Sequence, residues 1–271
     1  VSAGITNMAL DAFFVGLFRW GVAGAALATG ISQCVGGILP LIYFIRPNTS
    51  LLRLTKTKLE IRPMLHACAN GSSELMSNIS ASIVSIIYNF QLLKYVGEDG
   101  VSAYGVLMYV QFIFIAIYIG YSIGSAPIIS YHFGAGNYAE LKNMLQKSIL
   151  LTCSSGILLT FAAYLLAPVL SGIFVGYDAE LFELTCHAFR LFSFSFLLAG
   201  FNIFVSSLFT ALNNGAISAA ISFMRTLIFQ TASVLILPFF FDVDGIWLAI
   251  TVAEVCAFIF SAFFIWAKRE R

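Results

Sequence analysis

The sequence predicts an all-α polytopic membrane protein from its composition, its low charge and its long apolar runs. Of the 271 residues, 60% are hydrophobic and only 10% are charged. A soluble domain carries roughly a quarter of its residues charged and somewhat under half apolar, so a soluble fold of this composition would lack polar surface. A disordered chain is excluded because it would be poor in apolar residues. The near balance of 14 basic and 13 acidic residues gives no reason to expect nucleic acid as a partner.

A helix needs about 20 mostly apolar residues to span a bilayer. Runs of that order, separated by polar or glycine-containing breaks, occupy 22–45, 63–93, 101–131, 145–168, 186–211, 216–241 and 246–267. The breaks between them lie at 46–48, 97–100, 134–137, 213–215 and 242–245. A shorter run covers 1–18. Because the chain opens at Val1 inside apolar sequence, we expect it to begin within a helix and not with a signal peptide.

The loops alternate between basic and acidic. Basic residues gather at 46–62, at Lys142 and Lys147, and at 268–271, whereas the intervening loops are acidic. Short cytoplasmic loops are enriched in Lys and Arg, so the pattern predicts a multi-pass protein of the cell membrane with a cytoplasmic C-terminus.

The basic stretch 47–61 is predicted to be a cytoplasmic linker between two lobes. Residues 1–46 then form the last two helices of a first lobe, the first of them truncated, and 62–271 form a second lobe of six transmembrane helices. A faint internal echo between 21–29 and 245–251 supports a doubled architecture. Internal repeats of this kind are common in transporters.

Asp11 is the clearest ionisable residue within a span. It lies nine residues before Trp20 at the outer turn, and Thr29 lies nine residues after it, so both are about 13 Å from the turn. Asn7, four residues before Asp11, and Gln33, four residues after Thr29, are likewise at equal depth, one helical turn further from Trp20. These four residues offer the oxygen ligands of a small cation, and a proton is an alternative occupant of Asp11. The other interpretation is that they only bond one helix to its neighbour.

Several motifs, taken together, resemble the multidrug and toxic compound extrusion (MATE) family. Asn7-x-x-x-Asp11, Trp20-Gly21 and 24–33 resemble the fifth and sixth helices of that family. The segment 127–137 resembles the cytoplasmic end of its eighth helix, and 211–215 resembles the turn after its tenth.

The resemblance implies a twelve-helix antiporter of two six-helix lobes, which exports amphipathic or cationic compounds in exchange for Na⁺ or H⁺. It further implies a cation site that uses Asn7, Asp11 and Thr29 together with an Asp on the first helix. That helix is absent from this sequence, so we expect the missing N-terminal helices of the same protein to act as its partner.

The second lobe offers three further candidates for binding substrate or ion: Glu74, Arg190 and Glu254. The resemblance implies such a role for Glu74, and a Glu74–Arg190 ion pair is the alternative. Glu254 either lines the lobe or bonds to Gln230 and Ser233, which lie at comparable depth, whereas Arg225 is expected to extend toward the cytoplasm.

Aromatic faces suit cationic amphiphiles. Four aromatic residues are candidates for lining a cavity: Tyr88, Phe90, Tyr104 and Tyr118.

We expect no enzymatic activity, because the sequence has neither a HExxH helix nor a Ser/His pairing at matched depth. No metal and no cofactor besides the coupling ion are expected, since the histidines and cysteines lack ligand spacing. Two alternatives to drug export remain. A flippase for lipid-linked oligosaccharides should carry more intramembrane bases, and a non-transporting scaffold would leave the Asp11 cluster unexplained.

Overall fold

The computed structural model describes residues 1–46 and 60–268, and these residues are folded almost entirely into helices. The chain divides into two compact units, Val1–Glu60 and Ile61–Arg271. The predicted basic linker lies outside the described residues over 47–59, as do Arg269 and Arg271 at the end of the chain.

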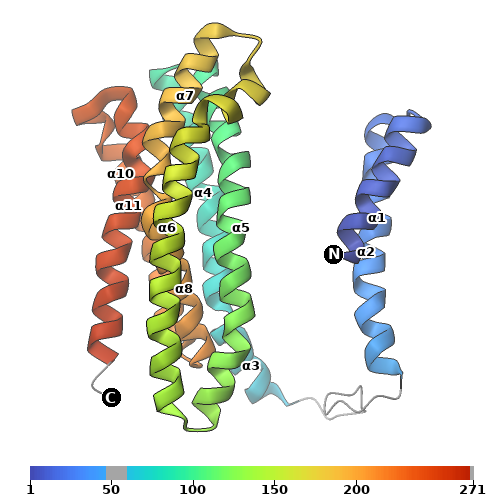
Figure 1. The fold of residues 1–271 in the computed structure, drawn as a ribbon, viewed down its shortest axis with the longest axis vertical. Coiled ribbons are helices and arrows are strands. Elements are labelled where there is room, and N and C mark those ends of the chain that lie inside the picture. Colours follow the sequence, from blue (N-terminus) through green and yellow to red (C-terminus); the bar gives the residue numbers. More distant parts are fainter. Residues whose placement is uncertain (47–59, 269–271) are drawn as a thin grey trace. The chain divides into compact units, whose positions relative to one another are not determined.

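The first unit is an antiparallel pair of helices (Figure 1). Helix α1 (Ser2–Asp11) continues as the π-helical segment η1 (Ala12–Leu17), and α2 (Gly21–Ile45) returns after a turn. The buried residues of α2 are Gly24, Ala28 and Ser32, spaced four apart on one face. Small side chains let two membrane helices approach closely, and a Cβ atom at Gly24 would lie 3.1 Å from the Cβ of Phe14.

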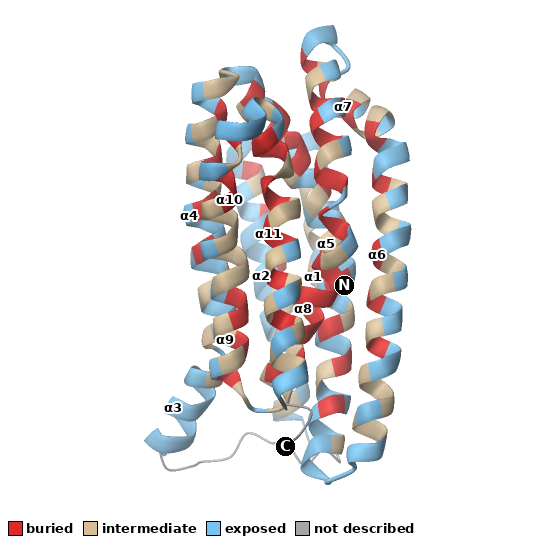
Figure 2. Cartoon of the chain, turned by 90° about the vertical axis from the view of Figure 1, so that its left-hand side faces the viewer, coloured by how far each residue is buried: buried red, intermediate tan, exposed pale blue. Residues whose placement is uncertain are grey.

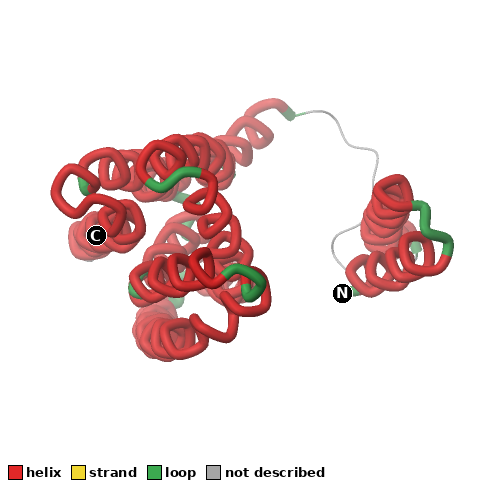
Figure 3. The backbone as a smooth tube through the Cα atoms, turned by 90° about the horizontal axis from the view of Figure 1, so that it is seen from above, coloured by secondary structure: helices red, strands yellow, loops and turns green. Residues whose placement is uncertain are grey.

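The second unit is a bundle of helices that run up and down through short connections (Figures 1 and 3). In chain order its elements are α3 (Ile61–Asn70), α4 (Ser72–Tyr95), α5 (Glu98–Gly134), α6 (Tyr138–Val175), α7 (Ala179–Ser193), α8 (Phe196–Ala211), α9 (Gly215–Phe223), η2 (Met224–Phe229), α10 (Gln230–Ile236) and α11 (Pro238–Lys268).

The predicted breaks at 97–100, 134–137, 213–215 and 242–245 coincide with helix ends or with the kink in α11. Each contains a residue in the left-handed backbone region: Gly97 (φ 90°), Gly136 (φ 69°), Asn213 (φ 58°) and Asp242 (φ 47°). Gly and Asn adopt this conformation more readily than other residues and commonly end helices. The positions of these four breaks, predicted from the turn residues in the sequence, are therefore confirmed.

Two of the expected spans are not single straight helices. The run 186–211 is broken into α7 and α8, which are bent by 50° relative to each other. The run 63–93 is broken at Gly71 into α3 and α4, and α4 is not among the described helices that are apolar enough to cross a membrane on composition alone. Helix α4 is instead rich in Ser and Asn.

The core of the second unit is packed with aromatic and aliphatic side chains. Trp247, Phe189 and Phe196 are each at most 1% exposed, and a second cluster forms around Phe204 and Ile221. The outward faces of α5 and α6 are exposed and largely apolar (Figure 2). Exposed apolar surface of this extent marks contact with lipid. At 37 and 38 residues, α5 and α6 exceed the length that a hydrocarbon core of about 30 Å requires.

Candidate functional site

A cavity of about 510 Å³ lies inside the second unit. Its walls come from α4, α5, α8, α9 and η2, with Gln230 of α10 and Ile250 of α11 completing the lining. Helix α4 contributes many of the polar groups, namely Glu74, Ser77, Asn78, Ser85 and Tyr88. The unusual polarity of α4 is therefore explained, because this side of the helix faces a cavity.

Glu74 and Arg225 are the charged residues among the side chains that line this cavity. The Glu74 carboxylate is exposed and accepts a long hydrogen bond of 3.4 Å from Nδ2 of Asn78. Among the described residues no ion pair joins Glu74 to Arg190, so the alternative that paired them is wrong. Arg190 lies instead over the ring of Tyr164, 5.7 Å from its centroid, and does not line the cavity.

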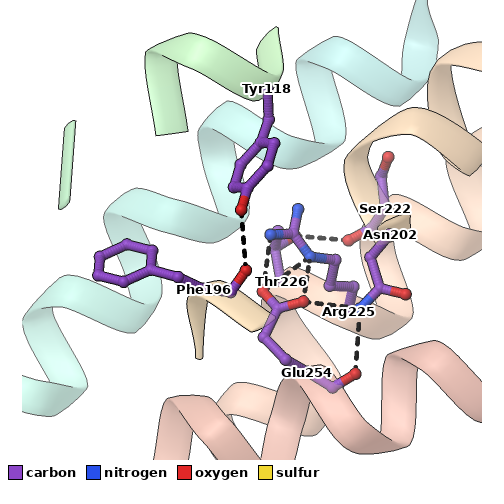
Figure 4. A network of polar contacts seen from close by, with 7 residues as sticks. All are labelled: Tyr118, Phe196, Asn202, Ser222, Arg225, Thr226 and Glu254. Carbon is purple, nitrogen blue, oxygen red and sulfur yellow. Dashed lines mark hydrogen bonds and ion pairs between the residues drawn. The ribbon is translucent and has the colours of Figure 1, made fainter. Parts of the chain in front are cut away.

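Arg225 forms a buried, two-pronged ion pair with Glu254 (Figure 4). Its Nη2 donates to Oε1 at 2.7 Å, and its Nε donates to Oε1 and Oε2 at 2.9 and 3.1 Å. Nδ2 of Asn202 on α8 donates to Oε2 at 2.7 Å and to the backbone carbonyl of Glu254 at 3.0 Å. Glu254 is therefore bonded to Arg225 and Asn202, and not to Gln230 and Ser233 as expected.

The backbone around Arg225 departs from the regular α-helix. Arg225 lies in η2, where the helix is π-helical between α9 and α10. A π-helical segment takes more residues per turn, so it rotates the next turns of the helix away from the face that an α-helical period predicts, and such segments are frequent at functional sites. The side chain of Arg225 extends toward the buried Glu254, and not toward the cytoplasm as the sequence interpretation had it.

A group of hydroxyls bonds α8 to α9 beside the pair. Oγ of Ser206 lies 2.8 Å from Oγ of Ser222 and 3.0 Å from Oγ of Ser218, and Thr210 donates to Ser218 at 2.7 Å. Ser206, Thr210 and Ser222 also line the cavity. Interhelical hydroxyl bonds of this kind hold membrane helices together, so one wall of the cavity is both polar and fixed.

The four predicted aromatic residues divide into two groups. Tyr88 and Tyr104 line the cavity and stack face to face, with ring centroids 5.1 Å apart. Phe90 is 70% exposed and lines a separate groove beside Glu98. Tyr118 is 2% exposed and donates to the backbone carbonyl of Phe196 at 3.0 Å, outside the cavity lining. Placing Phe90 and Tyr118 in this cavity requires correction.

In the first unit, Asp11 is half-buried, and its Oδ1 is buried without a hydrogen-bond partner among the described residues. The close contacts of Gly24 with Phe14 and of Gly36 with Ala3 set the register of the two helices. That register brings Asp11 near Ala28.

The same register brings Asn7 near Ser32. Ser32 is buried and donates to the carbonyl of Thr29 at 2.8 Å. Thr29 and Gln33 are exposed in this unit, and the Thr29 hydroxyl donates to the carbonyl of Ala25. The depths counted for Asp11 and Thr29, and for Asn7 and Gln33, therefore agree with this register to within one to two residues. Thr29 and Gln33 nevertheless lie at the edge of the helix interface and not inside it.

Outside the cavity, Nε2 of His187 on α7 lies 2.8 Å from Oδ1 of Asp244 beside the kink of α11. Both side chains are about half exposed. No three His, Cys, Asp or Glu side chains gather into a metal-holding group in 1–46 or 60–268.

These features define a polytopic α-helical membrane protein with a polar cavity inside one of its helical units. Residues 75–234 match the family model described as MatE, which is more than half of the chain, and the chain belongs to that family. The resemblance seen in the sequence motifs is thereby confirmed.

Curated relatives are similar along the whole chain but are longer than it. The chain is 24% identical over 277 residues to the multidrug export protein MepA of Staphylococcus haemolyticus, covering 100% of this chain and 59% of the relative. It is 23% identical to the MepA of Staphylococcus saprophyticus, covering 98% of this chain and 58% of that protein. The chain thus spans less than two thirds of the length of these relatives.

Solved structures share the fold. A MATE structure in complex with MaL6 matches with a TM-score of 0.89 at 20% identity, covering 100% of this chain and 62% of that one. The outward-facing conformation of a multidrug resistance MATE transporter matches with a TM-score of 0.89 at 21% identity and the same coverage. A transporter of the MOP superfamily from Pyrococcus furiosus matches with a TM-score of 0.87 at 21% identity, covering 98% and 61%. The predicted all-α membrane fold is confirmed.

Proposed function

We propose that this chain is part of a cation-coupled antiporter that exports amphipathic or cationic compounds across the cell membrane, with Na⁺ or H⁺ as the coupling ion. Its membership of the MatE family and its likeness to proteins described as multidrug export proteins support the proposal. In this proposal the C-terminus is cytoplasmic, as the basic residues at the chain's end indicate.

The cavity of the second unit is the observation that carries the proposal. A space of about 510 Å³ is large enough for part or all of a drug-sized molecule. Its walls combine apolar side chains such as Met108 and Ile119 with stacked tyrosines and amides. Glu74 supplies a carboxylate without an ion-pair partner among the described residues, which favours a ligand that carries a positive charge.

Asp11 is the proposed coupling residue. An unpartnered carboxylate oxygen buried inside a membrane helix pair is costly unless a cation or a proton neutralises it. Asn7 and Ser32 lie near it in the register of the two helices and offer further oxygen atoms. Thr29 and Gln33 lie exposed beside this interface and complete the proposed ligand group from its edge.

The binding of the coupling ion at Asp11 drives export only if the conformations of the transporter bind that ion with different affinities. The proposed cycle therefore alternates between a state in which Asp11 is neutralised and a state in which the cavity holds the exported compound.

Gradient-driven efflux tests this function. The protein expressed from its complete reading frame is placed in vesicles loaded with a cationic dye, and a Na⁺ or H⁺ gradient is imposed. We expect one of the two gradients to drive efflux, Asp11→Asn to abolish it, and Glu74→Gln to reduce it. Lys94→Gln is the matched control, because it removes a charge that does not line the cavity.

One result would overturn the proposal and another would overturn only the role of Asp11. If well-folded protein exports no dye under either gradient, the antiporter assignment fails. If Asp11→Asn exports dye at the wild-type rate, the transporter assignment survives but coupling at Asp11 is wrong.

A further inference from the structure

The cavity contains a positive group that the export of simple cations does not require. Arg225 lines the cavity, and its side chain retains 14% exposure. Its counterion, Glu254, has a side chain that is only 3% exposed and does not line the cavity. The pair is therefore oriented, with the arginine toward the cavity and the carboxylate behind it.

The guanidinium group has donors to spare. Its Nε and Nη2 donate to Glu254, whereas no hydrogen bond among the described residues uses Nη1. Arginine carries five N–H donors and stays protonated in proteins. In Figure 4 the two nitrogens that bond to Glu254 lie on one side of the group, and the third points away from the carboxylate. An anionic ligand in the cavity would thus find unused donors on a side chain that is already fixed in place.

A buried ion pair is weak evidence for stability. The cost of desolvating both charges often cancels their attraction, so well-packed apolar side chains would hold α8, η2 and α11 together equally well. Ionisable residues inside a membrane are a functional feature by default. The pair therefore needs a role beyond packing, and its orientation toward the cavity indicates one.

Arg225 and Glu74 lie at different depths in the cavity. Helices α4 and α9 begin at the same end of the bundle, because Gly215 lies directly against the backbone of Asn70, and their paths stay adjacent. Glu74 is four residues beyond Asn70 and Arg225 is ten residues beyond Gly215. At 1.5 Å per residue this places the Cα of Arg225 about 9 Å further along the bundle axis than the Cα of Glu74.

We propose that Arg225 is an anion-binding group of the transport cavity and that the preferred substrates are zwitterionic amphiphiles, whose carboxylate binds Arg225 while their cationic end binds Glu74. This inference rests on the proposed function and gives it a substrate class. Glu254 holds the guanidinium in position and offsets its charge in the absence of substrate. Asn202, which donates two hydrogen bonds to Glu254, is a positioning residue for the pair.

Binding of two matched dyes in detergent tests the inference without any ion gradient. Tetramethylrhodamine carries a free carboxylate beside its cationic ring system, and tetramethylrhodamine methyl ester is the same molecule with the carboxylate masked. Affinities are measured by fluorescence anisotropy on the protein expressed from its complete reading frame. The variant is the double substitution Arg225→Gln with Glu254→Gln, which removes both charges and leaves neither one buried alone.

We expect the double variant to bind the free acid about tenfold more weakly than the wild type does, because a charged hydrogen bond is lost. Its affinity for the methyl ester should be unchanged, which also shows that the cavity is intact. Glu74→Gln should weaken both dyes, since both are cationic at the other end. Lys94→Gln, which removes a positive charge away from the cavity lining, should weaken neither.

The inference is overturned if the double variant binds the free acid as tightly as the wild type does, or if it weakens both dyes equally. It is also overturned if the wild type fails to bind the free acid. These results are distinct from failure of the proposed function, which appears as absent gradient-driven efflux in vesicles while dye binding in detergent persists.

Discussion

Asp11 and Glu254 are both acids within apolar helical segments, and the structure treats them in opposite ways. Glu254 accepts three hydrogen bonds from Arg225 and one side-chain hydrogen bond from Asn202. Asp11 has a buried carboxylate oxygen with no hydrogen-bond partner in the part of the chain that the structure describes. Glu254 has a positively charged partner within the fold, whereas the buried oxygen of Asp11 has no partner among the described residues.

Burial alone therefore does not assign a role to a membrane acid. The charge of an acid that is paired with a cation inside the protein is already compensated, so removing the cation should lower the free energy of unfolding. An acid without such a partner has no pairing interaction that a substitution could remove. The contrast separates Glu254, which holds Arg225 in place, from Asp11, which we propose as the residue that binds the coupling ion. Substitutions that disturb the Glu254 pair should therefore destabilise the protein more than the substitution of Asp11 does.

Arg225→Ala should destabilise the protein most. It leaves the Glu254 carboxylate buried and unpaired, and breaking a buried pair costs about 3–5 kcal/mol. We expect a large drop in the midpoint of thermal unfolding in detergent. The double substitution Arg225→Gln with Glu254→Gln should unfold near the wild-type temperature, and an equal loss in both variants would show that the unpaired charge is not the cause.

A smaller loss is expected from Asn202→Leu. It removes two hydrogen bonds to Glu254, and one of them reaches a charged oxygen, which is worth about 1.5–3 kcal/mol. Thermal unfolding measures the loss. If the same substitution introduced into the Arg225→Gln, Glu254→Gln background costs as much, the effect is one of packing and not of the network.

The third expected effect concerns the helix interface that holds Asp11. A Cβ atom at Gly36 would lie 3.1 Å from the Cβ of Ala3, whereas nothing lies within 4 Å of a Cβ at Gly37. Gly36→Leu should therefore destabilise the protein by about 1–3 kcal/mol through overpacking. Gly37→Leu is the control, and equal melting temperatures for the two variants would show that α1 and α2 are not packed as described.

Asp11→Asn should change stability least. No hydrogen bond to the buried Oδ1 is lost, and the desolvation cost of a carboxylate is relieved. The unfolding midpoint should stay at the wild-type value or rise slightly. A fall comparable to that of Asn202→Leu would mean that Asp11 already has a stabilising partner, and the contrast with Glu254 would collapse.

The sequence was sufficient for the connections and the fold class, because glycine and asparagine in left-handed conformations end helices by local rules. It was not sufficient for the two breaks inside apolar runs, each of which has a serine hydroxyl bonded to the preceding turn. Ser193 donates to the carbonyl of Arg190 at 2.7 Å beside the bend between α7 and α8. Ser72 donates to the carbonyl of Ala69 at 2.7 Å beside the break at Gly71. Serine back-bonding bends a helix, but most serines in a membrane helix do not break it.

The candidate site was predictable in part. The polarity of Glu74 and the tyrosines at 88 and 104 correctly indicated the cavity lining. The partner of Glu254 was not predicted, because candidates were matched to it by depth alone, and the long side chain of Arg225 reaches it from more than one turn before Gln230. Depth counted from Trp20 paired Asp11 with Thr29, whereas the contacts of Gly24 with Phe14 and of Gly36 with Ala3 place the facing residues one to two positions earlier on α2.

If the coupling ion at Asp11 and the substrate in the second unit are thermodynamically coupled, each must change the affinity for the other by the same factor. The decisive experiment measures the affinity for tetramethylrhodamine methyl ester in detergent across a series of Na⁺ concentrations and pH values, for the wild type and for Asp11→Asn. We expect dye affinity to depend on one of the two ions in the wild type and on neither in Asp11→Asn. A variant that keeps the full wild-type ion dependence would show that the coupling ion binds elsewhere.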